Sequence, residues 1–583
     1  MNPTLLVKQF DRISDAPDGI ARLRRFVLDL AVRGKLVGQD PGDEPASALI
    51  KRVRLRKAEI ANEGAVRKEK PFPPLAENTL PFPIPPTWKW SQIAEIGFLN
   101  PRNTAENEIQ SSFVPMPRIS AEYGVSSTHE VRPWGEIKSG FTHFAEGDVG
   151  LAKITPCFEN GKSAIFRGLT GSIGAGTTEL HIVRPVIVLA EYVLIFLKSP
   201  HFIESGTTKM TGTAGQKRVS TEYFAYSPFP LPPLAEQHRI VAKVTELMTL
   251  CDRLETAQRE RETRRDRLAA ASHHHLNNGT NGKAYRGHAN FYINHLPIIT
   301  TRPEHIPALR RAVLSKAVRG ELVRQDTSDE SASLLLRRIE AEKVRLVKEG
   351  KINREKPPIP ARPDDLEFEL KPGWEAARIS QLLVELQTGP FGSSLHESDY
   401  ERGGIPVINP ASIKNGRLIP IDSMAVGPAT LKRLVSFKLR ANDIVMARRG
   451  EMGRCGIVTE REAGWLCGTG SLILRLPDCL FPPFLVTLIG SPFVREYLGG
   501  SAVGATMQNL NQSILLSLVV GLPPLAEQRR IVARVNELMA LCDRLAVQLT
   551  ATQANTSRLL ESVLYHALNN GSGEIDKKFA VQS

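Results

Sequence analysis

The chain has 583 residues, and its hydrophobic (42%) and charged (23%) fractions are ordinary for globular proteins. At roughly 100–200 residues per domain, this length predicts about three to five packed units. The net charge of +13 and the pI near 9.4 are compatible with a polyanionic partner such as nucleic acid, and equally with a basic protein that has no such partner.

Six cysteines occur and none lies in a C-x-x-C pair, which argues against a zinc ribbon. So few thiols in so long a chain favour a reducing compartment. The sequence contains no stretch of 18 or more apolar residues, and its start lacks a basic segment followed by an apolar run. We therefore expect a cytoplasmic protein without a signal peptide or a membrane span.

Residues 1–87 form a first block that we predict to be helical. Its segment 23–40 reads LRRFVLDLAVRGKLVGQD, and the pattern returns at 309–326 as LRRAVLSKAVRGELVRQD. Apolar residues recur there at the spacing of one helix face, with basic residues beside them. We expect both segments to be helices that pack on longer ones.

Residues 88–230 form a second block, which we predict to be a compact domain. Short apolar runs alternate with glycine-rich turns, and a helix-like stretch follows at 191–206. Residues 374–521 follow the same plan but show little identity to the first domain. Curved, mainly antiparallel sheets with a few helices are expected in both.

Residues 231–373 form a helical spacer that contains an irregular linker at 272–306. Its segment 232–254, PPLAEQHRIVAKVTELMTLCDRL, returns with four changes at 523–545 in the last block, residues 522–583. Proline suits a helix start, and the apolar steps of four and three form a heptad seam. The seam residues that we expect to pack helices or partner subunits are Ile240, Val244, Leu247, Leu254, Ile531, Val535, Leu538 and Leu545.

The order similar–different–similar–different–similar predicts an internal pseudo-two-fold repeat. The predicted fold class is α+β, with two α/β domains separated by long antiparallel coiled-coil helices. Repeated blocks should do one job twice, and unlike blocks of matched length should do parallel jobs on different targets.

Each unlike block carries basic, amide and hydroxyl side chains in glycine-rich loops. Such side chains can hydrogen-bond to base edges and phosphates, although loops of this kind are also common on plain protein surfaces. The candidate DNA-binding residues are Lys153, Thr155, Asn160, Lys162, Lys209, Gln216, Lys217 and Arg218 in the first block, and Ser393, Ser394, His396, Arg448, Arg449, Arg454, Gln508 and Asn509 in the second.

The two PPLAEQ segments and the two LRR…AVRG segments resemble the conserved regions of type I restriction–modification specificity subunits. The stretches GDVGLAKITPCFENGKSAI at 147–165 and NDIVMARRGEMGRCGIV at 442–458 are similar to parts of their target-recognition domains. The resemblance covers nearly the whole chain. It implies that 88–230 and 374–521 are target-recognition domains, each reading one half of a split, asymmetric DNA sequence.

The resemblance also implies the partners. These are double-stranded DNA, two methyltransferase subunits docked on the helices, and restriction–translocase subunits. No catalytic residue, metal or cofactor is expected in this chain, since S-adenosylmethionine would belong to the methyltransferase, and ATP and Mg²⁺ to the motor.

Two alternatives remain, a fused single-chain restriction–modification enzyme and a protein scaffold without DNA. The motifs that would favour an enzyme fail. Gly161-Lys162-Ser163 lacks the upstream glycine of a phosphate loop, because position 156 is Pro156. Phe481 stands where an amino-methyltransferase motif requires an amide or acid. The adjacent histidines 273–275 would point in different directions on a helix.

Overall fold

We describe the protein from a computed structural model. The structure describes residues 16–63, 73–75, 80–213, 215–278, 291, 294–296, 298–353, 359–391, 394–414, 416–500 and 510–570. The chain divides into two compact units, Met1–Glu262 with Thr552–Ser583, and Thr263–Ala551. Each unit combines helices with mainly antiparallel sheets, so the predicted α+β class is confirmed. Among the described residues, no helix has both the length and the apolar character that a bilayer span requires.

Unit 1 contains a head with short helices and two flanking helices from the N-terminal block. The helices of this unit are α2 (Gly19–Val32), α3 (Ala46–Asn62), α4 (Ile93–Ile96), α5 (Trp134–Ile137), α6 (Ala190–Leu197), α7 (Pro200–Thr208) and α8 (Thr221–Tyr226). The long helix α9 (Leu234–Asn278) begins in unit 1 and ends in unit 2.

Three sheets form the head of unit 1, which we call head 1. An antiparallel pair joins β1 (Lys89–Gln92) to β10 (Pro228–Leu231) at the two ends of the head. One four-stranded sheet has the order β2 (Gly97–Leu99), β9 (Leu180–Pro185), β6 (Val149–Ala152), β7 (Ser163–Ile165). The other has the order β4 (Glu130–Pro133), β3 (Gln110–Val114), β8 (Ile173–Gly176), β5 (Thr142–Ala145), and its β3–β8 pair is parallel.

Unit 2 repeats the helical plan. Its helices are α11 (Ile306–Val318), α12 (Ala332–Lys348), α13 (Ile379–Leu382), α14 (Pro428–Arg433), α15 (Pro482–Ile489), α16 (Pro492–Gly500) and α17 (Gln512–Ser517). The long helix α18 (Leu525–Asn570) begins in unit 2 and ends in unit 1.

The head of unit 2, head 2, repeats the strand plan as well. The end pair is β11 (Glu375–Arg378) with β21 (Val519–Leu522), and the four-stranded sheet has the order β12 (Glu385–Thr388), β20 (Ser471–Arg475), β17 (Ile444–Ala447), β18 (Cys455–Ile457). A further sheet has the order β16 (Ala425–Val426), β13 (Tyr400–Ile408), β19 (Leu466–Cys467), again with one parallel pair, β13–β19, and β14 (Ile413–Lys414) pairs with β15 (Arg417–Leu418). Two blocks with little sequence identity therefore share the end pair and the four-stranded sheet, and they differ in the second sheet.

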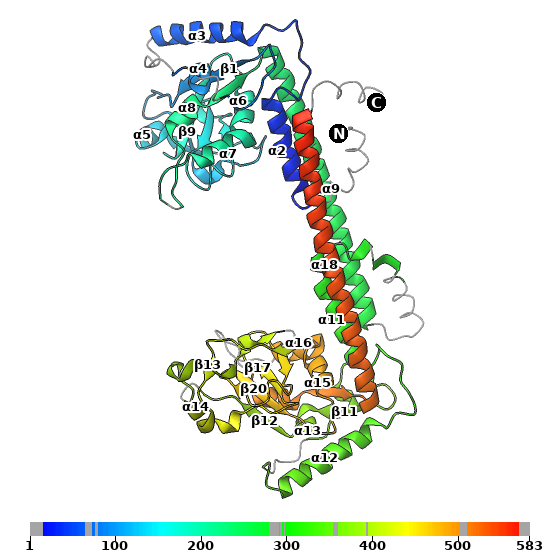
Figure 1. Cartoon of the computed structure of the whole chain (residues 1–583). Helices are drawn as coiled ribbons and strands as arrows, with labels where there is room; N and C mark the ends of the chain where they lie inside the picture. Colours follow the sequence, from blue (N-terminus) through cyan, green and yellow to red (C-terminus); the bar gives the residue numbers. More distant parts are fainter. Residues whose placement is uncertain are drawn as a thin grey trace. The chain divides into compact units, whose positions relative to one another are not determined.

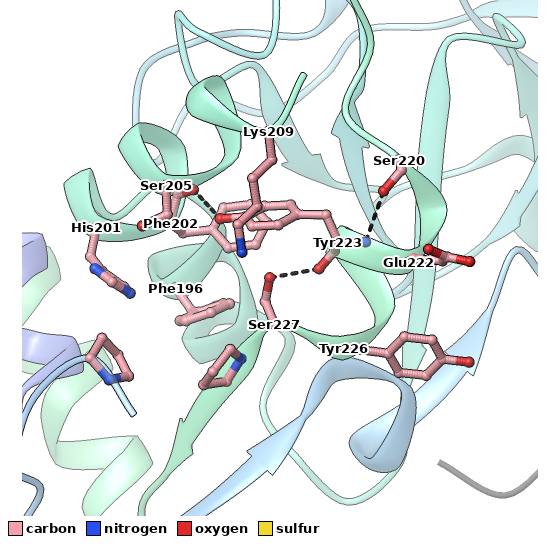
Figure 2. Close-up of a pocket in the computed structure, with 12 residues that line it drawn as sticks. Phe196, His201, Phe202, Ser205, Lys209, Ser220, Glu222, Tyr223, Tyr226 and Ser227 are labelled. Carbon is pink, nitrogen blue, oxygen red and sulfur yellow. Dashed lines mark hydrogen bonds between the residues drawn. The ribbon is translucent and has the colours of Figure 1, made fainter. Parts of the chain in front are cut away.

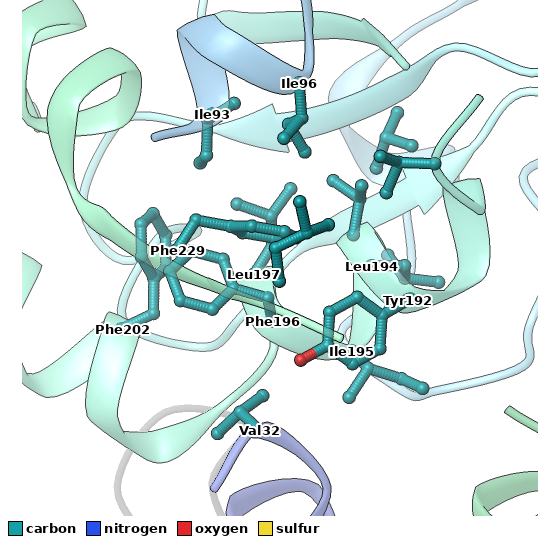
Figure 3. Packing of buried hydrophobic residues seen from close by; sticks show 14 of the residues in the cluster. Val32, Ile93, Ile96, Tyr192, Leu194, Ile195, Phe196, Leu197, Phe202 and Phe229 are labelled. Atoms are coloured by element: carbon teal, nitrogen blue, oxygen red, sulfur yellow. The ribbon is translucent and has the colours of Figure 1, made fainter. Parts of the chain in front are cut away.

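The core of unit 1 joins the repeated helices to the head. Figure 3 shows Val32 of α2 near aromatic and aliphatic side chains of α6 and β10, among them Phe196 and Phe229. The Tyr192 hydroxyl at this core donates a 2.8 Å hydrogen bond to the Pro230 carbonyl. A fully buried aromatic hydroxyl is thus satisfied, as burial of a polar group requires.

The repeated segments contact one another through the same side chains in both units. Gln39 donates to Glu236 at 2.8 Å in unit 1, and Gln325 donates to Glu527 at 3.0 Å in unit 2. The matching ion pairs are Arg239–Asp43 in unit 1 and Arg530–Asp329 in unit 2, each with a shortest contact of 2.6 Å. The repeated sequence therefore makes the same contacts in both units. These contacts hold the first turns of α9 and α18 against the segments that contain Gln39 and Gln325.

The short helix α2 contacts both long helices within unit 1 (Figure 1). Arg24 pairs with Asp252 of α9, and Arg22 pairs with Glu561 of α18. In unit 2, α11 likewise contacts both, since Arg310 pairs with Asp543 of α18 and Leu309 packs beside Ala269 of α9. In each unit the early part of one long helix and the late part of the other therefore flank the same short helix, as the predicted antiparallel arrangement requires.

Candidate nucleic-acid interface

Each head anchors its candidate loop with a buried aspartate just before a central strand. In head 1, Asp148 precedes β6, and its carboxylate accepts from the Ala145 amide at 2.7 Å and from Arg184 at 2.8 Å. In head 2, Asp443 precedes β17 and accepts from the Arg440 amide at 2.8 Å. Burial raises the pKa of both carboxyls above the ordinary value, despite the neighbouring arginines.

The arginine beside this aspartate is bound differently in the two heads. The Arg184 side chain is bidentate on Asp148, whereas Arg475 Nε lies 3.7 Å from Asp443 Oδ1, beyond hydrogen-bond distance. Arg475 donates instead to Glu385. This aspartate framework was not predicted from the sequence, although GDVGLAK and NDIVMAR share the order of aspartate, buried strand and basic residue.

In head 1, the loop after β6 is hydrogen-bonded to the loop before α8. The Thr155 amide donates to the Lys217 carbonyl at 2.9 Å, and the Thr155 hydroxyl reaches the same oxygen at 3.1 Å. The Val219 amide donates to the Lys153 carbonyl at 2.9 Å. Two candidate segments that lie far apart in the sequence therefore form one surface, which we call the head 1 loop pair (153–155 and 216–219).

The other candidate residues of head 1 differ in exposure and in whether their side chains already contact other groups of the protein. Asn160, Gln216 and Lys217 are exposed. Arg218 makes a bidentate ion pair with Glu179, and this pairing lowers the pKa of Glu179. Lys162 Nζ lies 3.4 Å from the Met116 carbonyl oxygen. Arg218 and Lys162 therefore make contacts within the protein, whereas the side chains of Asn160, Gln216 and Lys217 are exposed to solvent.

Lys209 lies at a different place from the head 1 loop pair. It lines the pocket drawn in Figure 2. The volume of this pocket is about 560 Å³, and the Lys209 ammonium group lies 5.4 Å from the centre of the Tyr223 ring. Phe196 and Phe202 also line this pocket, and the Tyr223 hydroxyl donates to the Phe202 carbonyl at 2.6 Å. The structure does not bring Lys209 into the cleft that Lys153 lines.

In head 2, the loop after β17 meets the segment before α17 in the same way. The Leu510 amide donates to the Arg448 carbonyl at 3.1 Å, and Arg448 Nε donates to the Leu510 carbonyl at 3.0 Å. Arg449 is exposed, and Arg454 is half-buried with its carbonyl accepting from the Ala447 amide at 2.8 Å. The second head thus presents a loop rich in arginine where head 1 presents lysine and threonine.

Two further candidates of head 2, Ser394 and His396, lie in the described part of the chain and make other contacts. Ser394 accepts from Arg433 through its carbonyl at 2.7 Å, and the exposed His396 donates its amide to Asp399 at 2.8 Å. No hydrogen bond or ion pair within the described part of head 2 connects them to the Arg448 loop. Ser393, Gln508 and Asn509 lie outside the described residues.

The predicted seam residues of the long helices occupy matching environments in the two copies. Ile240, Val244, Ile531 and Val535 are buried, whereas Leu247, Leu254, Leu538 and Leu545 are half-buried. One further leucine is repeated and exposed, with 51% exposure at Leu250 and 43% at Leu541. The repeat therefore places an exposed leucine at the same position of both long helices.

The chemistry of these surfaces is recognition by hydrogen bonding and positive charge. Within the described ranges, no three His, Cys, Asp or Glu side chains are grouped as a metal site would require. The basic and hydroxyl groups of the loops can donate to phosphates and to base edges.

Comparison with known proteins gives consistent matches. A family model described as "Type I restriction modification DNA specificity domain" matches residues 372–552. The chain is 36% identical over 560 residues to the type I restriction enzyme EcoEI specificity subunit of Escherichia coli, covering 94% of each protein. It is 36% identical over 565 residues to the EcoAI specificity subunit of the same species, again covering 94% of each.

Among solved structures, the HsdS subunit from Thermoanaerobacter tengcongensis is 18% identical to the chain. The TM-score is 0.44, and the match covers 84% of this chain and 99% of the other.

Proposed function

Because the chain belongs to the family of type I restriction enzyme specificity subunits, we propose that it is the DNA sequence-recognition subunit of a type I restriction–modification complex. Each head reads one half of a split target. The chain itself is not catalytic, and the methyltransferase and endonuclease activities lie in its partner subunits. Its site of action is the cytoplasm.

The proposal rests on one observation. The same end pair and four-stranded sheet occur in both heads, but the loops that they hold present different side chains. Both heads join the loop after a central strand to the segment before the last short helix, through Lys153 and Val219 in head 1 and Arg448 and Leu510 in head 2. The side chains presented there differ. Equal frameworks with unequal loops are what the reading of two different half-sites requires, since base edges specify and phosphate contacts only position.

The repeated helices are proposed to dock two methyltransferase subunits. Leu250 and Leu541 occupy equivalent positions of α9 and α18, and both are exposed. Identical surfaces serve identical partners, whereas the unlike heads serve unlike DNA. Restriction–translocase subunits join this assembly, S-adenosylmethionine is bound by the methyltransferase subunits, and ATP and Mg²⁺ are bound by the motor subunits.

The test is methylation mapping. The chain is expressed with its methyltransferase subunit in a methylation-free host, and the modified bases of the host genome are sequenced. We expect a split, asymmetric motif that is absent when the methyltransferase subunit is expressed alone. A soluble complex that leaves the genome unmethylated would contradict the proposal, and methyl transfer by this chain alone would replace it with a fused enzyme.

A further inference from the structure

Head 1 contains a small polar cleft beside the head 1 loop pair. Its volume is about 180 Å³. The residues that line it come from the loops after β2 and β6, from the beginnings of β5 and β9 with the residues just before them, and from the start of α8. Among them are Arg102, His143, Lys153 and His181. Lys153 thus belongs both to the cleft and to the loop pair, whose Val219 amide donates to its carbonyl.

The positive charges of this cleft are not neutralised by the protein. Neither the Arg102 nor the Lys153 side chain makes an ion pair or hydrogen bond within the described part of the chain. The Glu179 carboxylate interacts electrostatically with Lys153, but it already accepts two hydrogen bonds from Arg218.

Other arginines of head 1 have acidic partners. Arg132 pairs with Glu130, and Arg167 pairs with Glu191. The cleft therefore combines concave shape with uncompensated positive charge, which favours a ligand that carries hydrogen-bond acceptors.

The two histidines of the cleft are neutral. His181 donates from Nε2 to the Val219 carbonyl at 3.1 Å, and burial lowers its pKa to about 4. Its Nδ1 therefore carries no proton and can only accept. His143 uses both ring nitrogens, since Nε2 donates to the Lys138 carbonyl at 2.9 Å and Nδ1 accepts from the Asn103 amide at 3.2 Å. The positively charged donors of the cleft are thus Arg102 and Lys153, and its uncharged donors are the side chains of Asn100, Thr142, Thr178 and Thr221.

Head 2 does not repeat this chemistry. In head 1, His181 is the strand partner of Leu151 on β6, and in head 2 the corresponding partner of Met446 on β17 is Leu472. The Lys153 position is taken by Arg448, whose Nε is used by the Leu510 carbonyl. The histidine and the lysine of the cleft therefore have no counterparts at the matching positions of head 2, as a determinant of one half-site requires.

We propose that this cleft is a base-reading subsite of head 1, in which Arg102, supported by Lys153, recognises a guanine in its half-site. Guanine presents two acceptors, N7 and O6, in the major groove, and arginine binds both with its planar pair of donors. The inference rests on the proposed function, because it requires that head 1 meets duplex DNA.

The experiment compares Arg102→Ala with the wild-type chain, each in complex with its methyltransferase subunit. Methylated motifs are mapped in a methylation-free host, and binding to the mapped duplex and to duplexes changed at single positions is measured. We expect Arg102→Ala to lose discrimination at one guanine of one half-site, with binding to the wild-type site weakened by about 10- to 100-fold. Arg102→Lys should restore part of this preference.

The matched control is Arg167→Ala, which removes another exposed arginine of the same head that is paired with Glu191. It should leave the motif and the affinity unchanged. The other half-site and the gap should be the same in all variants.

Three outcomes would decide the matter. If the wild-type complex yields no bipartite motif, the proposed function itself fails. If it yields one and Arg102→Ala leaves every position as selective as before, the subsite is wrong while the function stands. If Arg102→Ala weakens binding equally to all duplexes and lowers the salt dependence, Arg102 contacts phosphate and the base-reading role is overturned.

Discussion

Head 1 and head 2 share buried residues around the central strand and differ in side chains around the loop that follows it. Both place an aspartate before the central strand, Asp148 in one and Asp443 in the other, and both join the following loop to the segment before the last short helix. Around that loop, head 1 has Lys153 and the buried, neutral His181 where head 2 has Arg448 and the buried Leu472. One topology can therefore carry two recognition chemistries, because the hydrogen bonds that fix the loops are mostly made by the backbone and leave the side chains variable.

The largest expected difference between the heads lies in the buried aspartates. Asp148 is 1% exposed and accepts from Arg184 and the Ala145 amide, so Asp148→Ala should lower the free energy of unfolding of head 1 by about 3 kcal/mol. Asp443→Ala should cost head 2 about 1–2 kcal/mol, because Arg475 keeps its bond to Glu385. Urea denaturation followed by hydrogen exchange in each head measures both, and equal losses would show that the two frameworks are energetically the same.

The repeated helix surface should behave identically in the two copies. Leu250→Glu and Leu541→Glu are each expected to weaken binding of one methyltransferase subunit by about 30-fold, or roughly 2 kcal/mol, so that native mass spectrometry finds one bound copy instead of two. Val547→Glu is the control, because Val547 is exposed on α18 but its counterpart on α9 is Thr256. Equal effects of all three changes would argue against a repeated docking site.

Lys217 in head 1 and Arg448 in head 2 are expected to have different roles, the first in DNA binding and the second in stability. Lys217 is exposed, so Lys217→Ala should weaken DNA binding about 3-fold, reduce the salt slope by about one, and leave stability unchanged. Arg448→Ala should instead cost about 1 kcal/mol of stability, because Arg448 Nε donates to the Leu510 carbonyl. Binding at two salt concentrations and thermal unfolding distinguish the two, and a stability loss in Lys217→Ala would contradict the assignment.

The smallest expected effect concerns the repeated glutamates. Burial raises the pKa of Glu236 and Glu527, so the folded state binds protons that the unfolded state has released. Their contribution to stability is thus fully present below the unfolded pKa of about 4.3 and is lost as the pH rises through the folded pKa. Glu236→Gln and Glu527→Gln should each flatten the fall of stability above about pH 4.3, as measured by urea midpoints across pH. A slope unchanged by both variants would show that these carboxyls do not titrate with folding.

Much of the fold followed from the sequence. The repeated segments and the heptad spacing of Ile240 and Val244 predicted the long helices, because a helix face has a fixed period. The resemblance of the repeats to a known family is confirmed by 36% identity over nearly the whole chain. The candidate loops of head 1 were also predicted in part, since Lys153, Thr155 and Lys217 do meet.

Other features were decided only by the tertiary structure. Arg218 and Lys162, which stay predicted DNA contacts, also bind Glu179 and the Met116 carbonyl, and local sequence does not show which cation finds a partner in the fold. Arg102 was missed for the opposite reason, since it stands alone in sequence and reaches the cleft only when β2 ends beside β9 and β6.

Periodicity and repetition are short-range properties that a sequence displays directly, so the sequence alone determined the helices, the duplication and the family. Which charges remain uncompensated depends on pairings between residues distant in the chain. The unpaired Arg102 and Lys153 at one cleft, and the shared topology of two unlike heads, therefore emerged only from the folded chain.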